Sequence, residues 1–336
     1  MDKSIWLQNW SDFKSNLPHK NEPYSKRNWG SSLHSLCSYQ GKLKPSIAHH
    51  LITCFSSEGD LVMDPFSGSG TIPFEAALNA RRSVGFDISD MSVAITLAKI
   101  RNCSFHKSLE IIENLERYLS NNEPSEKTIK DSIDISFNKR IEDYFEKDTF
   151  QEILKARDFF LKTKNFNNPD WCLVFGSMLH ILHGNRPYAL SRRSHPLTPY
   201  APSGDFERKP LIKHLSDKVS KSLEEKKNIL IAEGECYKKD ILSDWENHFS
   251  GINAIITSPP FVASTKFYMT NWMRFWFAGW GKNDFQETTE SFVEVKQKKN
   301  IDIYIEIFKK FSKVLADDGV VVFHTGKNQT LDMAKI

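Results

Sequence analysis

The sequence has little cysteine and no long apolar run. Its five cysteines are odd in number and form no C-x-x-C pair; they stand at Cys37, Cys54, Cys103, Cys172 and Cys236. This pattern argues against a disulfide framework and a structural zinc site, so reduced, buried thiols are expected. No stretch approaches the roughly 20 apolar residues of a membrane-spanning helix, and the first ten residues lack the apolar core of a signal peptide. The expected compartment is the cytoplasm, with neither a membrane nor a metal as partner.

The sequence also lacks internal repeats, low-complexity tracts and a strong net charge. Forty-five Lys and Arg face 42 Asp and Glu, which gives a net charge of +3. Global charge therefore neither requires nor excludes a polyanionic partner. A length of 336 residues with 40% hydrophobic residues is typical of a water-soluble protein with one large domain or two ordinary ones.

Short apolar runs alternate with helical patterns, which indicates an α/β fold. Strands are predicted over residues 60–66, 83–88, 234–240, 252–258 and 320–325. Helices are predicted over residues 45–58, 71–80, 89–101 and 301–315. We expect a Rossmann-like, mostly parallel sheet with helices on both faces, interrupted by a mostly helical insertion.

The same pattern predicts the domain organisation. Residues 1–30 show no sustained periodicity and are expected to form an N-terminal arm. Residues 31–101 and 231–336 would form the α/β core, and residues 102–230 the insertion. The chain ends about ten residues after the last predicted strand, which leaves no room for a six- or seven-stranded sheet. We therefore expect a fragment, or a sheet edge that is completed in another way.

A glycine loop, DPFSGSGT, connects the first strand to its helix. Glycines at this position let the backbone approach a ligand at the carboxyl edge of a parallel sheet. The dinucleotide fingerprint needs a third glycine where Pro73 stands, and a P-loop needs a lysine after Gly70, so both are disfavoured. Asp87, 17 residues after Gly70, ends the second strand, where a carboxylate can accept both hydroxyl protons of a ribose. An ordinary tight turn and a helix cap are the alternatives for these two features.

The sharpest signal is TSPPF, residues 257–261, at the end of an apolar strand. Two consecutive prolines lack N–H donors, so the chain must leave the sheet rigidly at its carboxyl edge. The turn fixes the Ser258 hydroxyl, the Pro259 carbonyl and the Phe261 ring in space. Two acceptors beside an aromatic face suit a planar ring with an exocyclic amine, as a nucleobase has.

Together these segments resemble the amino-methylating DNA methyltransferases, which use S-adenosylmethionine. DPFSGSGT is similar to their cofactor motif I, Asp87 to motif II, TSPPF to the catalytic motif IV, and HSLCSYQGKLKP to motif X. Asp240 stands where their motif III carboxylate approaches the adenine amine. The likeness covers roughly residues 31–101 and 230–336 and implies a class I methyltransferase fold. It implies cofactor contacts at Tyr39, Lys42, Asp64, Pro65, Phe66, Ser67, Gly68, Gly70, Thr71, Asp87, Ile88 and Asp240, and catalytic roles for Ser258, Pro259, Pro260 and Phe261.

Ser258 bears on the target base. Family members that methylate adenine N6 usually carry Asp or Asn at this position, whereas a serine resembles the cytosine N4 group. The resemblance thus implies methylation of a flipped-out cytosine in double-stranded DNA, within a restriction-modification or defence system with a cognate restriction endonuclease. The alternatives are an adenine N6 or RNA amino-methyltransferase of the same fold, and a nucleic-acid-binding subunit without turnover.

The insertion, residues 102–230, is the candidate DNA target-recognition region, and it carries a candidate DNA-binding surface. Between residues 181 and 220, seven Lys and Arg face three Asp and Glu, a local charge of +4. A basic, loop-rich patch suits a phosphate backbone, and a solvated surface loop is the alternative. The candidate DNA-binding residues are Arg186, Arg192, Arg193, His195 and Lys209. The run 267–280, with seven aromatics in 14 positions, would either line the base pocket or pack in the core.

Overall fold

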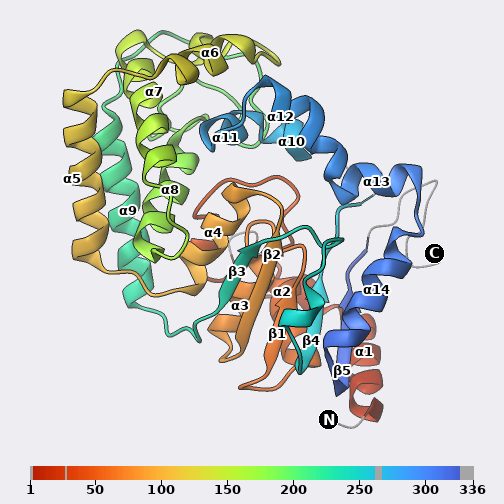
Figure 1. Cartoon of the computed structure of the whole chain (residues 1–336). Coiled ribbons are helices and arrows are strands. Elements are labelled where there is room, and N and C mark those ends of the chain that lie inside the picture. Colours follow the sequence, from red (N-terminus) through yellow and green to blue (C-terminus); the bar gives the residue numbers. More distant parts are fainter. Residues whose placement is uncertain (1–2, 27–28, 262–266, 326–336) are drawn as a thin grey trace.

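The computed structural model describes residues 3–26, 29–261 and 267–325, and its centre is a five-stranded parallel sheet (Figure 1). The strands are β1 Leu61–Asp64, β2 Arg82–Asp87, β3 Glu235–Lys238, β4 Ile252–Thr257 and β5 Leu315–Phe323. They pair in the order β3-β2-β1-β4-β5, all in parallel. β1 and β4 are short apolar runs that are buried on both sides, as the central strands of such a sheet must be.

Helices cover both faces of the sheet, as predicted. α2 (Pro45–Phe55) and α3 (Thr71–Leu78) pack on one face, and α4 (Asp90–Ile100) lies beside α3 over β2 and β3. On the other face, α14 (Ile303–Val314) buries Ile307 and Phe311 against Met63 of β1. The predicted Rossmann-like sheet with helices on both faces is therefore confirmed.

Residues 102–230 form a helical body above the sheet in Figure 1. Its helices are α5 Phe105–Asn121, α6 Glu126–Asp134, α7 Lys147–Lys162, α8 Pro169–Ile181 and α9 Leu211–Lys227. α8 joins this body to the core, because Gly176 on α8 faces Ile95 on α4. α9 lies within the insertion, which is predicted to be mostly helical.

The helical body also takes up chain from beyond β4. The remaining helices are α10 Phe267–Thr270, α11 Trp272–Phe277, α12 Lys282–Glu287 and α13 Val293–Lys299. The fully buried Arg157 of α7 donates from Nε to the carbonyl of Trp276 on α11 at 2.8 Å, and its guanidinium lies 5.4 Å from the Trp276 ring. Most aromatics of the run 267–280 therefore pack in a core. The helical body therefore combines residues 102–230 with the run 267–280 from beyond β4. The prediction differs here, because it assigns all residues from 231 onward to the α/β core.

The two ends of the described chain differ from the sequence expectations. α1 (Lys3–Asn16) is a helix instead of an irregular arm, and its Trp6 and Phe13 pack against the α2 side of the sheet. Few apolar residues mark this helix, which explains why the pattern is weak. β5 begins at Leu315, ahead of the predicted start at residue 320, because the register shifts between the pairs Ile252–Leu315 and Ala254–Val320.

Five short 3-10 helices complete the described structure: η1 Pro18–Lys20, η2 Ser32–Ser35, η3 Ile141–Tyr144, η4 Glu246–His248 and η5 Thr288–Ser291.

Candidate active site

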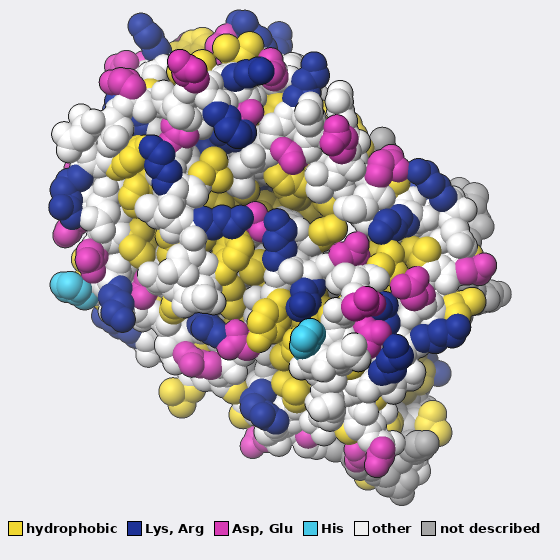
Figure 2. All heavy atoms as spheres, in the orientation of Figure 1, with side chains coloured by type: hydrophobic (Ala, Val, Ile, Leu, Met, Phe, Trp, Pro, Cys, Tyr) yellow, Lys and Arg dark blue, Asp and Glu magenta, His cyan; other side chains and the backbone are white. Residues whose placement is uncertain are grey.

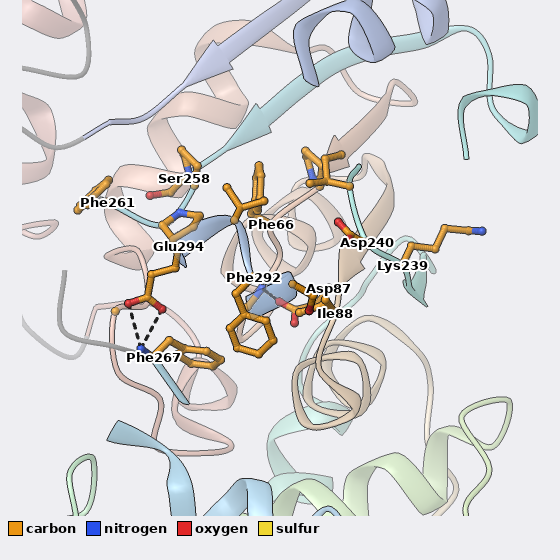
Figure 3. A pocket seen from close by; sticks show the side chains of 18 of the residues that line it. Phe66, Asp87, Ile88, Lys239, Asp240, Ser258, Phe261, Phe267, Phe292 and Glu294 are labelled. Carbon is orange, nitrogen blue, oxygen red and sulfur yellow. Dashed lines mark hydrogen bonds between the residues drawn. The ribbon is translucent and has the colours of Figure 1, made fainter. Parts of the chain in front are cut away.

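A cavity of about 250 Å³ lies where β1, β2, β3 and β4 end. Because the strands are parallel, their carboxyl ends meet at one edge of the sheet, where ligands bind in this class of fold. The cavity is lined by Tyr39, Gln40, Gly41, Pro65, Phe66, Gly68, Asp87, Ile88, Lys239, Asp240, Ile241, Ser258, Pro259, Pro260, Phe261, Phe267, Ser291, Phe292, Val293 and Glu294. Figure 3 shows that Phe292 lies beside Asp87 and Ile88, and that the Glu294 carboxylate points toward the backbone N–H of Phe267.

A smaller cavity of about 40 Å³ adjoins the first and shares Tyr39, Gly41, Phe66, Gly68 and Ser258 with it. Its other lining residues are Lys42, Leu43, Asp64, Ser67, Ser69, Thr71 and Ile72. The two cavities thus bring together the four predicted catalytic residues and, except for Gly70, all the predicted cofactor residues. The segments that resemble motifs I, II, III, IV and X therefore surround one site.

Gly70 lines neither cavity, but the glycine loop depends on it. Its φ is +71°, and a Cβ at this position would come within 2.6 Å of Thr96 Oγ1 and 2.9 Å of Thr96 Cα on α4. Gly68, with a φ of +51°, faces the Tyr39 hydroxyl, which would lie 3.0 Å from an added Cβ. Both glycines therefore allow a left-handed turn and close packing that side chains would prevent.

Backbone donors orient the Asp87 carboxylate. Gly68 N donates to Oδ2 at 2.9 Å, and Ser89 N donates to Oδ1 at 2.8 Å. Burial raises the pKa of Asp87 to about 6, although these hydrogen bonds oppose the shift. Near pH 7 the carboxylate is therefore mostly ionised, and its remaining lone pairs are available to donors in the cavity.

Asp64 connects the glycine loop to the predicted catalytic residues Ser258–Phe261, a segment that we name the catalytic turn after this prediction. Its Oδ1 accepts hydrogen bonds from Thr257 Oγ1 at 2.6 Å and from Phe66 N at 3.1 Å. Burial raises the pKa of Asp64 to about 7. The bond to Thr257 fixes the end of β4 beside the end of β1, so the segments similar to motifs I and IV are held in register.

The catalytic turn is the segment Ser258–Phe261, and its two prolines offer no backbone donor. Groups from outside hold it. The N–H of His324, which follows β5, donates to the Thr257 carbonyl at 2.8 Å, and His324 Nδ1 lies 3.4 Å from Ser258 Oγ. The Gln297 side chain donates from Nε2 to the Pro260 carbonyl at 3.0 Å.

Helix α13 closes the far side of the site, and sequence reasoning missed it. Buried Glu294 accepts from the N–H of Phe267 at 3.0 Å, and Gln297 one turn later contacts the catalytic turn. Lys296 forms an ion pair with Asp240 at 3.6 Å. The polar stretch that contains these residues carries no motif, and only the fold brings it back to the sheet edge.

The structure divides the predicted DNA-binding residues into two groups. Arg186 and Arg193 are exposed. Arg192 instead donates to the carbonyls of Gly204 and Asp143, and Lys209 donates to the carbonyls of Ala189 and Ser191 at 2.8 Å. These two cations stabilise their own loop.

His195 is exposed, but its Nδ1 accepts from the backbone N–H groups of Leu197 and Thr198 at 3.3 and 3.1 Å. It too has a local role in the loop.

Figure 2 shows hydrophobic side chains in a hollow near the middle of the visible face, with Lys and Arg side chains around it.

The described residues contain neither a membrane-spanning helix nor a cluster of metal ligands. No helix in residues 3–26, 29–261 and 267–325 is long and apolar enough to cross a membrane. In the same part of the chain, no three His, Cys, Asp or Glu side chains are placed to hold a metal ion together.

Comparison with known proteins shows similarity over parts of the chain. Residues 3–98 match the N6/N4 family model for DNA methylases. The Type II methyltransferase M.MjaII of Methanocaldococcus jannaschii is 29% identical over 80 residues, which are 24% of this chain and 15% of that protein. The orphan methyltransferase M.BamHII of Bacillus amyloliquefaciens is 42% identical over 65 residues, 19% of this chain and 24% of that protein. The matches span less than a quarter of either relative. Residues 3–98 are therefore similar to the corresponding part of the N6/N4-type DNA methylases, as the motifs in this stretch predict.

Proposed function

We propose that this protein transfers a methyl group from S-adenosylmethionine to the exocyclic N4 amine of a cytosine that is flipped out of double-stranded DNA. The observation that carries the proposal is the shared cavity, in which Asp87 and the glycine loop lie across from the catalytic turn. A methyl donor held on one side of this cavity and an amine on the other would meet without further rearrangement of the sheet edge.

The residues of the cavity fit the methyl donor. Asp87 presents an oriented carboxylate for the ribose hydroxyls, and Ile88, Phe66 and Phe292 offer apolar surface for the adenine. The smaller cavity, beside the N-terminus of α3 and Lys42, suits the methionine carboxylate. When bound, the donor supplies an electrophilic methyl group on a sulfonium ion.

The catalytic turn would act on the amine by hydrogen bonding. An aromatic amine is a poor nucleophile because its lone pair is delocalised into the ring. Acceptors at Ser258 Oγ and the Pro259 carbonyl would draw both N–H bonds out of the ring plane and localise that lone pair. Phe261 would stack on the flipped base. Positioning and electrostatics thus account for the acceleration, with no covalent enzyme intermediate.

The choice of cytosine rests on Ser258, because this serine stands where the adenine-specific relatives usually carry Asp or Asn.

The two similar proteins are named as methyltransferases, one of them as Type II. We extend this to a role of the present protein in the cytoplasm, in a restriction-modification or defence system, with a cognate restriction endonuclease as its partner.

One experiment tests reaction and base together. The purified protein is incubated with isotopically labelled S-adenosylmethionine and unmethylated genomic DNA, and the digested nucleosides are identified by mass spectrometry. We expect labelled N4-methylcytosine. Labelled N6-methyladenine would support the reaction and contradict the argument from Ser258. Absence of label in DNA despite measurable binding of the methyl donor would contradict the proposed function.

Substitution of the catalytic serine tests the mechanism. Ser258→Ala should lower kcat by on the order of 10²-fold, because one acceptor for the amine is lost. Binding of the methyl donor should persist. Ser120→Ala, on the exposed surface of α5, is the matched control. Activity of Ser258→Ala equal to that of the control would contradict a catalytic role for this hydroxyl.

A further inference from the structure

His324 is a second polar side chain at the catalytic turn, and no motif in the sequence marks it. It follows β5, the neighbour of β4 in the sheet. Its N–H donates to the carbonyl of Thr257 at 2.8 Å, so its backbone is fixed to the residue just before the turn. From there Nδ1 lies 3.4 Å from Ser258 Oγ, and the ring centroid lies 6.4 Å from that of Phe261.

The direction of the contact between Ser258 and His324 decides what the serine can do. A hydroxyl has one O–H donor and two lone pairs. If the Ser258 hydroxyl donates to Nδ1, both lone pairs can accept from a substrate amine. If a protonated Nδ1 donates to Oγ instead, one lone pair is occupied and the hydroxyl proton must find another acceptor. Because Pro259 and Pro260 have no N–H groups, neither of them donates a backbone hydrogen bond to the lone pairs of Ser258 Oγ.

We propose that neutral His324 accepts the hydroxyl proton of Ser258, keeps that oxygen as an acceptor for the target amine, and takes up, through Ser258, the proton that methylation releases. This inference rests on the proposed function and deepens it. His324 acts through Ser258 and is therefore a positioning residue and a proton acceptor behind the catalytic turn.

The proposed step balances. The amine lone pair forms a bond to the methyl carbon, and the electrons of the broken S–C bond stay on the sulfur, which becomes a neutral thioether. The methylated amine carries one positive charge until it loses a proton. That proton passes to Ser258 Oγ while the original hydroxyl proton passes to His324 Nδ1. The serine is unchanged, and the imidazolium later releases its proton to solvent, which reaches the half-buried ring.

The electrostatics around His324 support the neutral form. Burial lowers the pKa of His324 from its usual value of 6.5, so the ring is mostly neutral near pH 7. His19 on η1 is a titratable neighbour from another element, and its pKa is lowered by burial first, then by the charges of Lys44 and Lys20, and least by His324. On the β4 side, the ring faces the uncharged Ser258. Acidification would protonate Nδ1 and reverse the hydrogen bond.

Two variants separate orientation from proton uptake. His324→Asn keeps an acceptor oxygen near the position of Nδ1 but takes up no proton, and His324→Leu removes both functions. At saturating DNA and methyl donor, we expect kcat of wild type to fall with one inflection below pH 6.5. That inflection should be absent in His324→Asn. His324→Leu should lose on the order of 10²-fold in kcat at pH 7.5, with unchanged affinity for the methyl donor. His106→Asn, exposed on α5, is the matched control.

A second measurement is independent of turnover. The pKa of His324 is followed by NMR in wild type and in Ser258→Ala. If the serine donates to neutral Nδ1, its removal destabilises the neutral ring and raises the pKa of His324. An unchanged or lowered pKa would overturn the inference whether or not the protein methylates DNA. If the wild-type protein methylates DNA and His324→Leu has the same kcat and pH profile, the inference about His324 is also overturned. The proposed function would then remain intact.

Discussion

Asp87 provides a quantitative test of the cofactor side of the site. Its two carboxylate oxygens already accept from Gly68 N and Ser89 N, so the carboxylate is oriented before any ligand binds. In Asp87→Asn, one oxygen becomes an NH₂ group, which faces a backbone N–H and cannot accept from a ribose hydroxyl. Loss of one hydrogen bond to a charged acceptor costs about 2 kcal/mol, or roughly 30-fold in Kd for S-adenosylmethionine.

The affinity for S-adenosylmethionine should also change with pH, and the pKa of Asp87 determines the direction of that change. Burial raises the pKa of Asp87 to about 6. Because the ionised form is the one proposed to accept the ribose hydroxyls, affinity for S-adenosylmethionine should be constant above the pKa and fall by up to about tenfold per pH unit below it. The inflection near pH 6 should vanish in Asp87→Asn. Asp64, whose pKa is raised to about 7 in the adjoining cavity, would produce a separate inflection that the variant retains.

Isothermal titration calorimetry with S-adenosylmethionine between pH 5 and 8 measures both effects. Asp134→Asn, exposed at the end of α6, is the matched control for the loss of one negative charge. Thermal unfolding of each variant checks that the fold persists. The reasoning is refuted if Asp87→Asn binds the methyl donor as tightly as the control does, or if the inflection near pH 6 remains.

Two further predictions concern the glycine loop and the DNA surface. Gly70→Ala should lower the free energy of unfolding by about 2–4 kcal/mol in chemical denaturation, because strain at a φ of +71° adds to a clash with Thr96. Gly59→Ala, with a φ of +83° in open space, should show the strain alone, and equal losses would contradict the clash. Arg193→Ala should reduce the slope of log K for DNA against log salt by about one. Arg82→Ala, exposed at the start of β2 on the opposite edge of the sheet, should leave that slope unchanged, and a common slope would remove Arg193 from the interface.

The local parts of the fold and site follow from the sequence because each has a local cause. The apolar run 61–64 is followed by two glycines that allow the turn into α3, and Asp87 ends β2 where the pattern of hydrophobic residues stops. The proline pair at 259–260 forces the chain out of the sheet at the edge where those segments end. Parallel strand order then brings them together, so the two cavities could be predicted as one site.

The remaining features depend on contacts between distant segments. The charge of Arg192 alone predicts a phosphate contact, whereas the structure shows that its guanidinium also donates to the carbonyls of Gly204 and Asp143. Pattern likewise gives no reason to connect α13 with the catalytic turn, because Gln297 meets Pro260 only once the chain has passed through α10, α11 and α12. Side-chain to backbone contacts of this kind leave no periodic pattern of residues in the sequence, so they cannot be predicted from it.

α13 gives these contacts a common consequence. Lys296 of this helix forms an ion pair with Asp240 on the side of the cavity proposed to hold the adenine. Gln297 donates a hydrogen bond to the Pro260 carbonyl in the catalytic turn. Glu294, on the same helix, holds the N–H of Phe267, where the chain enters the helical body. A shift of this short helix therefore changes the methyl-donor side, the amine side and the junction with the helical body together. α13 is therefore one element that contacts both sides of the proposed methyl-transfer site and the start of the chain segment that enters the helical body.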